Sequence, residues 1–274
     1  MACRIIAFVN QKGGCGKTAT TVSVGSILAE RGKKVLLVDG DPQQHTTLSV
    51  GVNPYRIEHS LYEAMLDPRQ FGYEKVRVKT AYENLDLLPA TDNLYAVDLD
   101  LASAMNRDGR MERLLKPAIR HYDYILIDSP PALSLLTINI LNAAKEIFIV
   151  LQAHPHSYLG LEMLLQTVEQ VKENINPKLR ITGLVLTIFD TGTNVSKRIQ
   201  EKVQLDDRVS EFLFQTVIRK NITLANSTMA LEEEYEGVPV FLGKPINHYD
   251  RHSNSSKDYH KLVDEIIQME LDGS

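Results

Sequence analysis

A glycine-rich segment at 10–18 follows an apolar run at 5–9 that has the length of a buried strand. Its glycines, Gly13, Gly14 and Gly16, can take backbone angles that are closed to other residues. Consecutive backbone N–H groups can therefore turn inward around phosphate oxygens where the next helix begins. The segment predicts a loop that binds the phosphates of a nucleoside triphosphate.

Two side chains behind the glycines fit the same ligand. Lys17 adds a positive charge near the terminal phosphates, and Thr18 adds a hydroxyl for magnesium. The strict pattern G-x-x-x-x-G-K-[ST] nevertheless fails at its first position, where Gln11 stands, and a second lysine, Lys12, opens the loop. The residues alone leave open that Lys12 is an ordinary solvated lysine beside the loop.

Two further apolar runs end in carboxylates. Asp39 and Asp41 follow the run at 34–38, and Asp128 follows the run at 123–127. Such runs are core strands whatever the function, but polar groups at their carboxyl ends lie where open α/β sheets bind ligands. We therefore expect the three carboxylates at the same edge of the sheet as the phosphate loop.

Strand-like runs alternate with helical patterns along the chain, which predicts an α/β fold: a mostly parallel twisted sheet with helices on both faces. With 274 residues and 43% hydrophobic content, we expect a single domain over residues 1–274. Pro117 is expected to kink or split its helix. Strands are predicted at about 4–9, 34–39, 85–88, 123–128, 146–151, 181–187 and 212–218, and helices near 17–31, 57–66, 108–121, 134–144, 157–175, 195–204 and 257–269.

The composition favours a cytoplasmic protein. Two cysteines, Cys3 and Cys15, cannot form a disulfide framework and lack zinc spacing, which predicts a reducing compartment. The first strand begins too early for a signal peptide, and no apolar run reaches the roughly 20 residues that cross a bilayer. A net charge of −5 gives no global sign of nucleic-acid binding, so any DNA contact requires a local patch.

The string Q-K-G-G-C-G-K-T at 11–18 resembles the deviant Walker A box of the ParA/MinD family of ATPases. The segment D-G-D-P-Q at 39–43 is similar to the family's D-x-D-P-Q box, and D-S-P-P at 128–131 is similar to its D-x-P-P ending. Segments at 183–196, 215–222 and 243–250 resemble the Soj-type partition proteins in particular, and the likeness covers about residues 3–268. It implies the fold of a deviant Walker P-loop NTPase with ATP and Mg²⁺ as cofactors.

The resemblance also implies roles for single residues. Lys12 corresponds to the lysine that reaches across a dimer to the partner's nucleotide, and Asp41 to the aspartate that orients the attacking water. Lys17 acts beside them on the phosphates. The implied metal residues are Thr18, Asp39 and Asp128, with Asp128 acting through a water molecule. The implied ATP-binding residues are Lys12, Gly13, Gly14, Cys15, Gly16, Lys17, Thr18, Ala19 and Asn221, the last beside the base.

The chain departs from the family pattern at several positions. Ala19 replaces a second threonine, Arg219 stands where the family has proline, and Thr223 stands where it often has an arginine used for DNA. Extra residues before Gly243 predict an insertion around 227–242 that contains an acidic run. That run is either a solvated face or a contact for a basic partner peptide.

The family's dimers bind DNA without sequence preference through basic residues that contact phosphates. The segment 190–223 carries six basic and five acidic residues, so a solvated surface of mixed charge is the alternative to a DNA patch. The pairs at 197–198 and 219–220 favour DNA if they converge on one face of a dimer. The predicted DNA-binding residues are Lys197, Arg198, Arg219 and Lys220.

The resemblance predicts a nucleoid-associated partition or positioning ATPase. It would act as an ATP-dependent homodimer on non-specific DNA, with a ParB-like or cargo-adaptor protein stimulating hydrolysis, and its cargo would be a plasmid, a chromosome or a protein assembly. A MinD-like cycle on a membrane is the alternative, although the last helix is acidic. An iron-protein-like electron donor would need cluster cysteines between subunits. Cys15, near a helix amino terminus and two lysines, is predicted to have a lowered thiol pKa.

Overall fold

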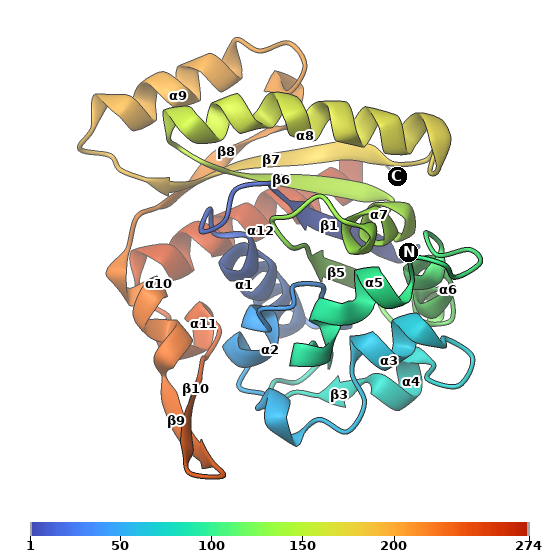
Figure 1. The fold of residues 1–274 in the computed structure, drawn as a ribbon. Helices are drawn as coiled ribbons and strands as arrows, with labels where there is room; N and C mark the ends of the chain where they lie inside the picture. Colours follow the sequence, from blue (N-terminus) through green and yellow to red (C-terminus); the bar gives the residue numbers. More distant parts are fainter. Residues whose placement is uncertain (1, 273–274) are drawn as a thin grey trace.

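A computed structural model describes residues 2–272. Eight strands form one sheet in the order β3-β4-β2-β5-β1-β6-β7-β8, and every neighbouring pair is parallel except β3 with β4 (Figure 1). The predicted fold and all seven predicted strands are confirmed, while the short β3 was not predicted. The strands are β1 (Arg4–Val9), β2 (Val35–Asp39), β3 (Val78–Lys79), β4 (Leu85–Leu88), β5 (Tyr124–Asp128), β6 (Glu146–Gln152), β7 (Arg180–Phe189) and β8 (Leu213–Arg219).

Helices cover both faces of this sheet because its central strands are apolar on both sides. In β1, Ile5, Ala7 and Val9 join one buried cluster, while Ile6 and Phe8 join the other. The helices are α1 (Lys17–Glu30), α2 (His45–Ser49), α3 (Leu61–Leu66), α4 (Tyr73–Val76), α5 (Val97–Asp100), α6 (Arg110–Leu115), α7 (Leu135–Ala143), α8 (Pro155–Asn174), α9 (Asn194–Gln204), α10 (Ile222–Asn226), α11 (Ile246–Tyr249) and α12 (Asn254–Asp272), with 3-10 turns η1 (Pro54–Arg56), η2 (Asp92–Ala96), η3 (Ala118–Arg120), η4 (Ser210–Phe212) and η5 (Ser227–Met229).

Several helix boundaries follow from capping and proline chemistry. Ser60 and Glu63 form a capping box, so α3 begins at Leu61 rather than at the predicted residue 57. Pro117 splits the predicted helix at 108–121 into α6 and η3. Pro155 occupies the first turn of α8, where its missing N–H costs nothing.

The segment 227–242, which the sequence predicts to be an insertion, contains η5 and a separate two-stranded sheet. Its strands, β9 (Leu231–Tyr235) and β10 (Val238–Leu242), pair antiparallel and project from the body as a hairpin (Figure 1). Glu236 and Gly237 form its turn with φ values of 50° and 80°, the left-handed pair that a tight hairpin needs.

Candidate functional site

The predicted phosphate loop connects the carboxyl end of β1 to the first turn of α1. Gly14 and Gly16 have φ values of 71° and 92°, which side-chain-bearing residues rarely adopt. A Cβ at Gly16 would also lie 3.7 Å from Thr187 of β7, so the loop is packed against the neighbouring strand end. The backbone therefore favours glycine at 14 and 16, as the sequence predicted, whereas Gly13 has open space around it and no left-handed φ.

Hydrogen bonds from neighbouring strands hold this loop in place. The Asn10 amide donates to the Val150 carbonyl on β6 at 2.6 Å, and its oxygen accepts from the Lys12 backbone N–H at 2.9 Å. The Thr187 hydroxyl donates to the Cys15 carbonyl at 2.6 Å. β6 and β7 thus fix the loop before any ligand binds, which lowers the ordering cost of binding phosphate.

Asp39 and Asp128 are register partners at the ends of β2 and β5, as predicted. Oδ2 of Asp128 accepts from the hydroxyls of Thr18 at 2.6 Å and Thr46 at 2.9 Å. Its other oxygen is buried and has no hydrogen-bond partner among the described residues. Burial raises the pKa of Asp128 to about 6. A divalent cation or one of its waters would satisfy the unpartnered oxygen, so these residues fit a magnesium site.

Asp39 is buried beside Asp128, but its oxygens are engaged by protein groups. Oδ2 accepts from the backbone N–H of Thr47 at 2.8 Å and from the Thr47 hydroxyl at 2.6 Å, and Oδ1 accepts from the Asp41 N–H at 3.3 Å. Burial, followed by the charge of Asp128, raises the pKa of Asp39 to about 7. In this structure Asp39 anchors α2 and the segment that carries Asp41.

The Lys12 side chain is hydrogen-bonded within its own chain. Its Nζ donates to Oε1 of Gln152 at 2.8 Å and to the hydroxyl of Ser157 at 3.1 Å, at the junction of β6 and α8. Lys17 lies on the other side of the glycines and is buried. The loop therefore carries two lysines in different surroundings, one in the first turn of α1 and one on a polar junction near the surface.

Comparison with known proteins agrees with this geometry. A family profile described as an AAA domain matches residues 3–181. Sporulation initiation inhibitor protein Soj of Bacillus subtilis is 37% identical over 263 residues, which cover 96% of this chain and 98% of Soj. The chain belongs to the ParA/Soj family of ATPases.

Two other relatives of this ParA-family ATPase are similar over nearly their whole length. Chromosome partitioning protein ParA of Caulobacter vibrioides is 34% identical over 272 residues, which cover 98% of this chain and 96% of that protein. A crystal structure of cobyrinic acid a,c-diamide synthase from Mycobacterium smegmatis, with a bound ATP analogue and magnesium, is 27% identical with a TM-score of 0.82. It covers 99% of this chain and 97% of its own, which confirms the predicted P-loop NTPase fold.

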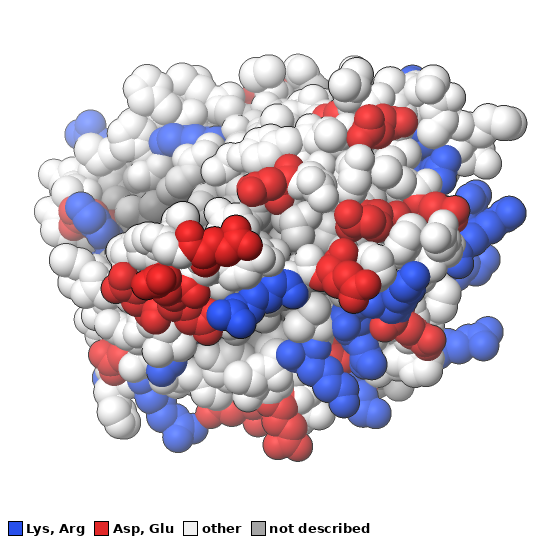
Figure 2. Space-filling view, turned by 60° about the horizontal axis from the view of Figure 1, so that its bottom comes forward, with Lys and Arg blue, Asp and Glu red and all other residues white. Residues whose placement is uncertain are grey.

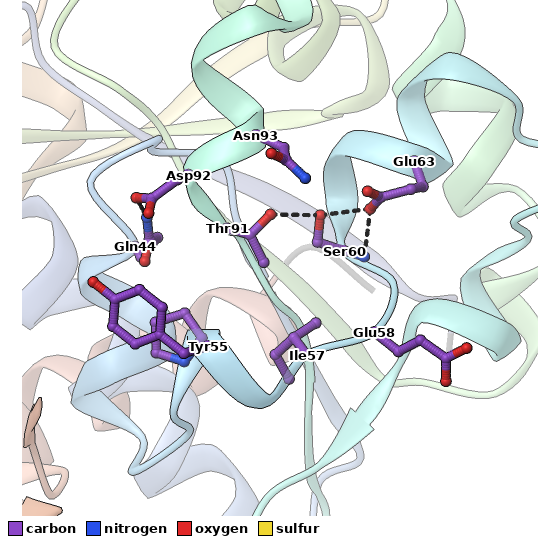
Figure 3. Close-up of a pocket in the computed structure, with 10 residues that line it drawn as sticks. Gln44, Tyr55, Ile57, Glu58, Ser60, Glu63, Thr91, Asp92 and Asn93 are labelled. Atoms are coloured by element: carbon purple, nitrogen blue, oxygen red, sulfur yellow. Dashed lines mark hydrogen bonds between the residues drawn. The ribbon is translucent and has the colours of Figure 1, made fainter. Parts of the chain in front are cut away.

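The segment after β2 of this ParA-family ATPase carries Gln44, which lines a cavity, and Asp41, which does not line that cavity. Oδ1 of Asp41 accepts from the Gln43 N–H at 3.0 Å, and Gln44 takes a left-handed φ of 60°. The Gln44 side chain donates to Asp92, and both line a cavity of ≈ 190 Å³ together with Tyr55 (Figure 3). No phosphate-loop residue lines this cavity, so we do not assign nucleotide to it.

Asn221, the predicted contact of the nucleotide base, uses its side chain within the protein. Asn221 caps α10, because its side chain accepts from the Thr223 N–H at 2.8 Å. Ala19 lines a small cavity between α1 and the α10–η5 segment, but Asn221 does not. The other residues that line this cavity are Val22, Ser23, Ser49, Leu224, Ser227, Thr228, Lys244, Pro245 and Ile246, of which the last three belong to the family-like segment 243–250.

Three of the four predicted DNA-binding residues are exposed near one edge of the sheet. Lys197 and Arg198 lie on α9, and the N–H of Lys220 donates to the Phe189 carbonyl at 3.0 Å, where β7 leads toward α9. Arg219 is partly exposed and is ion-paired within the chain. Asp258 of α12 accepts two hydrogen bonds from the Arg219 guanidinium, at 2.8 and 2.7 Å, which hold the side chain against α12.

The prediction for Cys15 is wrong. The thiol is 0% exposed and packs in the cluster between the sheet, α1 and α12. Burial raises its pKa, and this outweighs the opposing effect of the nearby Lys17 charge. The flanking glycines suggested an open position, whereas the loop turns this side chain toward the core.

We expect Cys15 of the folded, nucleotide-free protein to alkylate at least about tenfold more slowly than a free cysteine. Iodoacetamide labelling at pH 8, followed by mass spectrometry of the peptide, measures this rate. The same protein unfolded in guanidinium chloride is the control, in which Cys3 and Cys15 should both react at ordinary rates. Labelling of folded Cys15 at the free-cysteine rate would contradict the buried position.

Proposed function

We propose that this ParA-family ATPase partitions or positions a cargo by an ATP-dependent cycle on DNA. ATP and Mg²⁺ would close a homodimer that binds non-specific DNA, and a ParB-like or cargo-adaptor protein would stimulate hydrolysis and release. The observation that carries the proposal is the second lysine, Lys12, in front of a preformed phosphate loop, with Asp128 beside Thr18. Nucleotide would shift the monomer–dimer population only through contacts made in the dimer.

The loop amides, the backbone N–H of Ala19 and Lys17 would hold the phosphates of ATP. Thr18 and Asp128 would hold Mg²⁺, with Asp39 supporting Asp128 as its register partner. The ion would neutralise charge on the phosphate oxygens. Asp41 would orient the attacking water, and we keep Asn221 as a base contact within this proposal.

The DNA surface in this proposal consists of Lys197, Arg198 and Lys220, and leaves out Arg219. A patch of three cations is small for a chain with a net charge of −5. A dimer would double it, which explains why DNA binding would depend on ATP. The contacts would be to phosphates, so affinity should fall steeply with salt and hardly vary with sequence.

A double reversal, Lys197→Glu with Arg198→Glu, is expected to abolish DNA binding and leave ATP-driven dimerisation intact. Fluorescence anisotropy with two unrelated duplexes at low salt, with ATP and Mg²⁺, measures the loss. Lys116→Glu with Arg120→Glu is the matched control, because it makes the same charge change at exposed positions before β5, a central strand that is separated from β7 by β1 and β6. Failure of the wild-type ATP dimer to bind either duplex would overturn the DNA part of the proposal.

The membrane alternative has less support. The sequence of α12 carries two lysines, Lys257 and Lys261, against five acidic residues, Asp258, Asp264, Glu265, Glu270 and Asp272, a balance that anionic lipid would not attract. Within residues 2–272, no helix combines the length and the apolar character needed to pass through a bilayer.

A further inference from the structure

The β9–β10 hairpin has two faces with different surroundings. Strand residues that are directly opposite share a face, so Tyr235, Val240 and Leu242 lie on one side of it. Val240 and Leu242 are buried, and the Tyr235 ring stacks on Tyr55 with 5.5 Å between ring centroids. The middle of this inner face is therefore packed against the body of the protein, while Leu231 and Val238 on the same face stay exposed.

Polar contacts fix the same inner face. Glu233 accepts a hydrogen bond from Asn53 at 3.2 Å and pairs with Arg56 at 3.8 Å. At the base of the hairpin, the Gly243 N–H donates to the Leu48 carbonyl of α2 at 2.8 Å. The hairpin is therefore held at its side and at its base, which pre-orders its other face at no further entropic cost.

The outer face pairs acidic with apolar residues. Glu232 lies opposite Phe241, and Glu234 lies opposite Pro239, and all four are exposed. Phe241 is 42% exposed, which is high for a phenylalanine. Among residues 2–272, neither Glu232 nor Glu234 has an ion pair or a side-chain hydrogen bond. Figure 2, in which the bottom of Figure 1 comes forward, shows a group of acidic side chains left of the centre, beside basic ones, and further acidic side chains on the right half.

The hairpin edges are also open, since its sheet contains only two strands. An unpaired edge can accept an additional extended segment through backbone hydrogen bonds. Pro239 lacks an N–H and weakens the β10 edge for this purpose. The β9 edge carries glutamate at three successive positions, 232–234, so it repels a second acidic strand.

We propose that the outer face of the hairpin is a docking surface for an extended, basic segment of a partner protein. Lysine or arginine side chains would pair with Glu232 and Glu234, and apolar side chains would cover Phe241. A second copy of this face would place glutamate against glutamate, and DNA would bring phosphate against the same carboxylates. The inference deepens the proposed function, because it gives the activating partner a surface.

The base of the hairpin connects the proposed docking surface to the proposed metal site. α2, which accepts the hydrogen bond from Gly243, carries Thr46 and Thr47. These threonines donate to the two buried carboxylates at the ends of β5 and β2. A partner on the hairpin would therefore be one short helix away from the residues proposed to hold the metal.

The test uses a fluorescein-labelled peptide of four Lys-Val repeats as the probe, with a Glu-Val peptide as the control. Anisotropy is measured with the nucleotide-free, full-length protein. Glu232→Lys with Glu234→Lys is expected to weaken binding of the Lys-Val peptide at least about tenfold, since two favourable charge pairs become repulsive. Glu169→Lys with Glu173→Lys, the same charge change at exposed positions of α8, should stay within about twofold of wild type.

Three outcomes would overturn the proposal: no binding of the Lys-Val peptide by wild type up to about 1 mM, equal loss in both double variants, or no loss in the hairpin variant. Hydrogen exchange gives a second measurement, in which the peptide should protect residues 231–242. Absence of that protection also counts against the proposal. Because these assays need neither ATP nor DNA, a failure of DNA binding would leave the docking surface standing, and the reverse also holds.

Discussion

Asp41→Ala is expected to lower ATP hydrolysis at least about tenfold, which corresponds to roughly 1.4 kcal/mol of activation free energy. Orienting the attacking water is a task of the transition state, whereas phosphate binding uses the loop amides and Lys17. The variant should therefore trap the ATP-bound dimer, and DNA binding should persist or increase. Phosphate release under single-turnover conditions, with sedimentation to follow the dimer, measures both effects.

Two control variants distinguish the loss of the Asp41 carboxylate from a disturbance of the loop that carries it. Asp41→Asn keeps an oxygen that can accept from the Gln43 N–H, so it should preserve the loop and still lose turnover. Asp92→Ala removes the partner of the Gln44 side chain and should leave turnover within about threefold of wild type. Unchanged turnover in Asp41→Ala would remove this residue from its proposed role.

Long apolar strands made most of the fold predictable. β1, β2, β5 and β6 are continuous apolar runs that end at polar loops, so their type and boundaries were readable from sequence. β3 has two residues, and α4, α5, α10 and α11 have four or five, too short for a periodic pattern to emerge. The capping box at Ser60 and Glu63 was a readable signal for the start of α3 that the predicted boundary overlooked.

The sequence also predicted which carboxylates would meet, because parallel strands bring their ends to one edge. It did not identify Thr46 and Thr47, whose contacts with Asp128 and Asp39 depend on how α2 folds back. It also did not foresee the ion pair of Arg219, because its partner, Asp258, lies 39 positions further along the chain. Local sequence shows which groups are present, but not which distant group neutralises them.

Lys12→Ala is expected to lose ATP-dependent dimerisation while keeping nucleotide affinity, because Lys17 and the loop amides remain. Each dimer would lose two charge-assisted contacts of about 1.5 kcal/mol, which weakens dimerisation by about a hundredfold or more. Sedimentation velocity with ATP and Mg²⁺ measures the dimer, and titration with a fluorescent ATP analogue measures the affinity. A variant that dimerises like wild type would show that Lys12 does not act across the dimer.

The contacts of Lys12 in this structure sharpen that test. To reach a partner's nucleotide, its Nζ has to leave Oε1 of Gln152 and the Ser157 hydroxyl. Ser157→Ala removes one of these bonds and keeps the lysine, so dimerisation should persist and require no more ATP than wild type. If Ser157→Ala instead impaired dimerisation as strongly as Lys12→Ala, the lysine would act through its own subunit, by holding the β6–α8 junction against the phosphate loop.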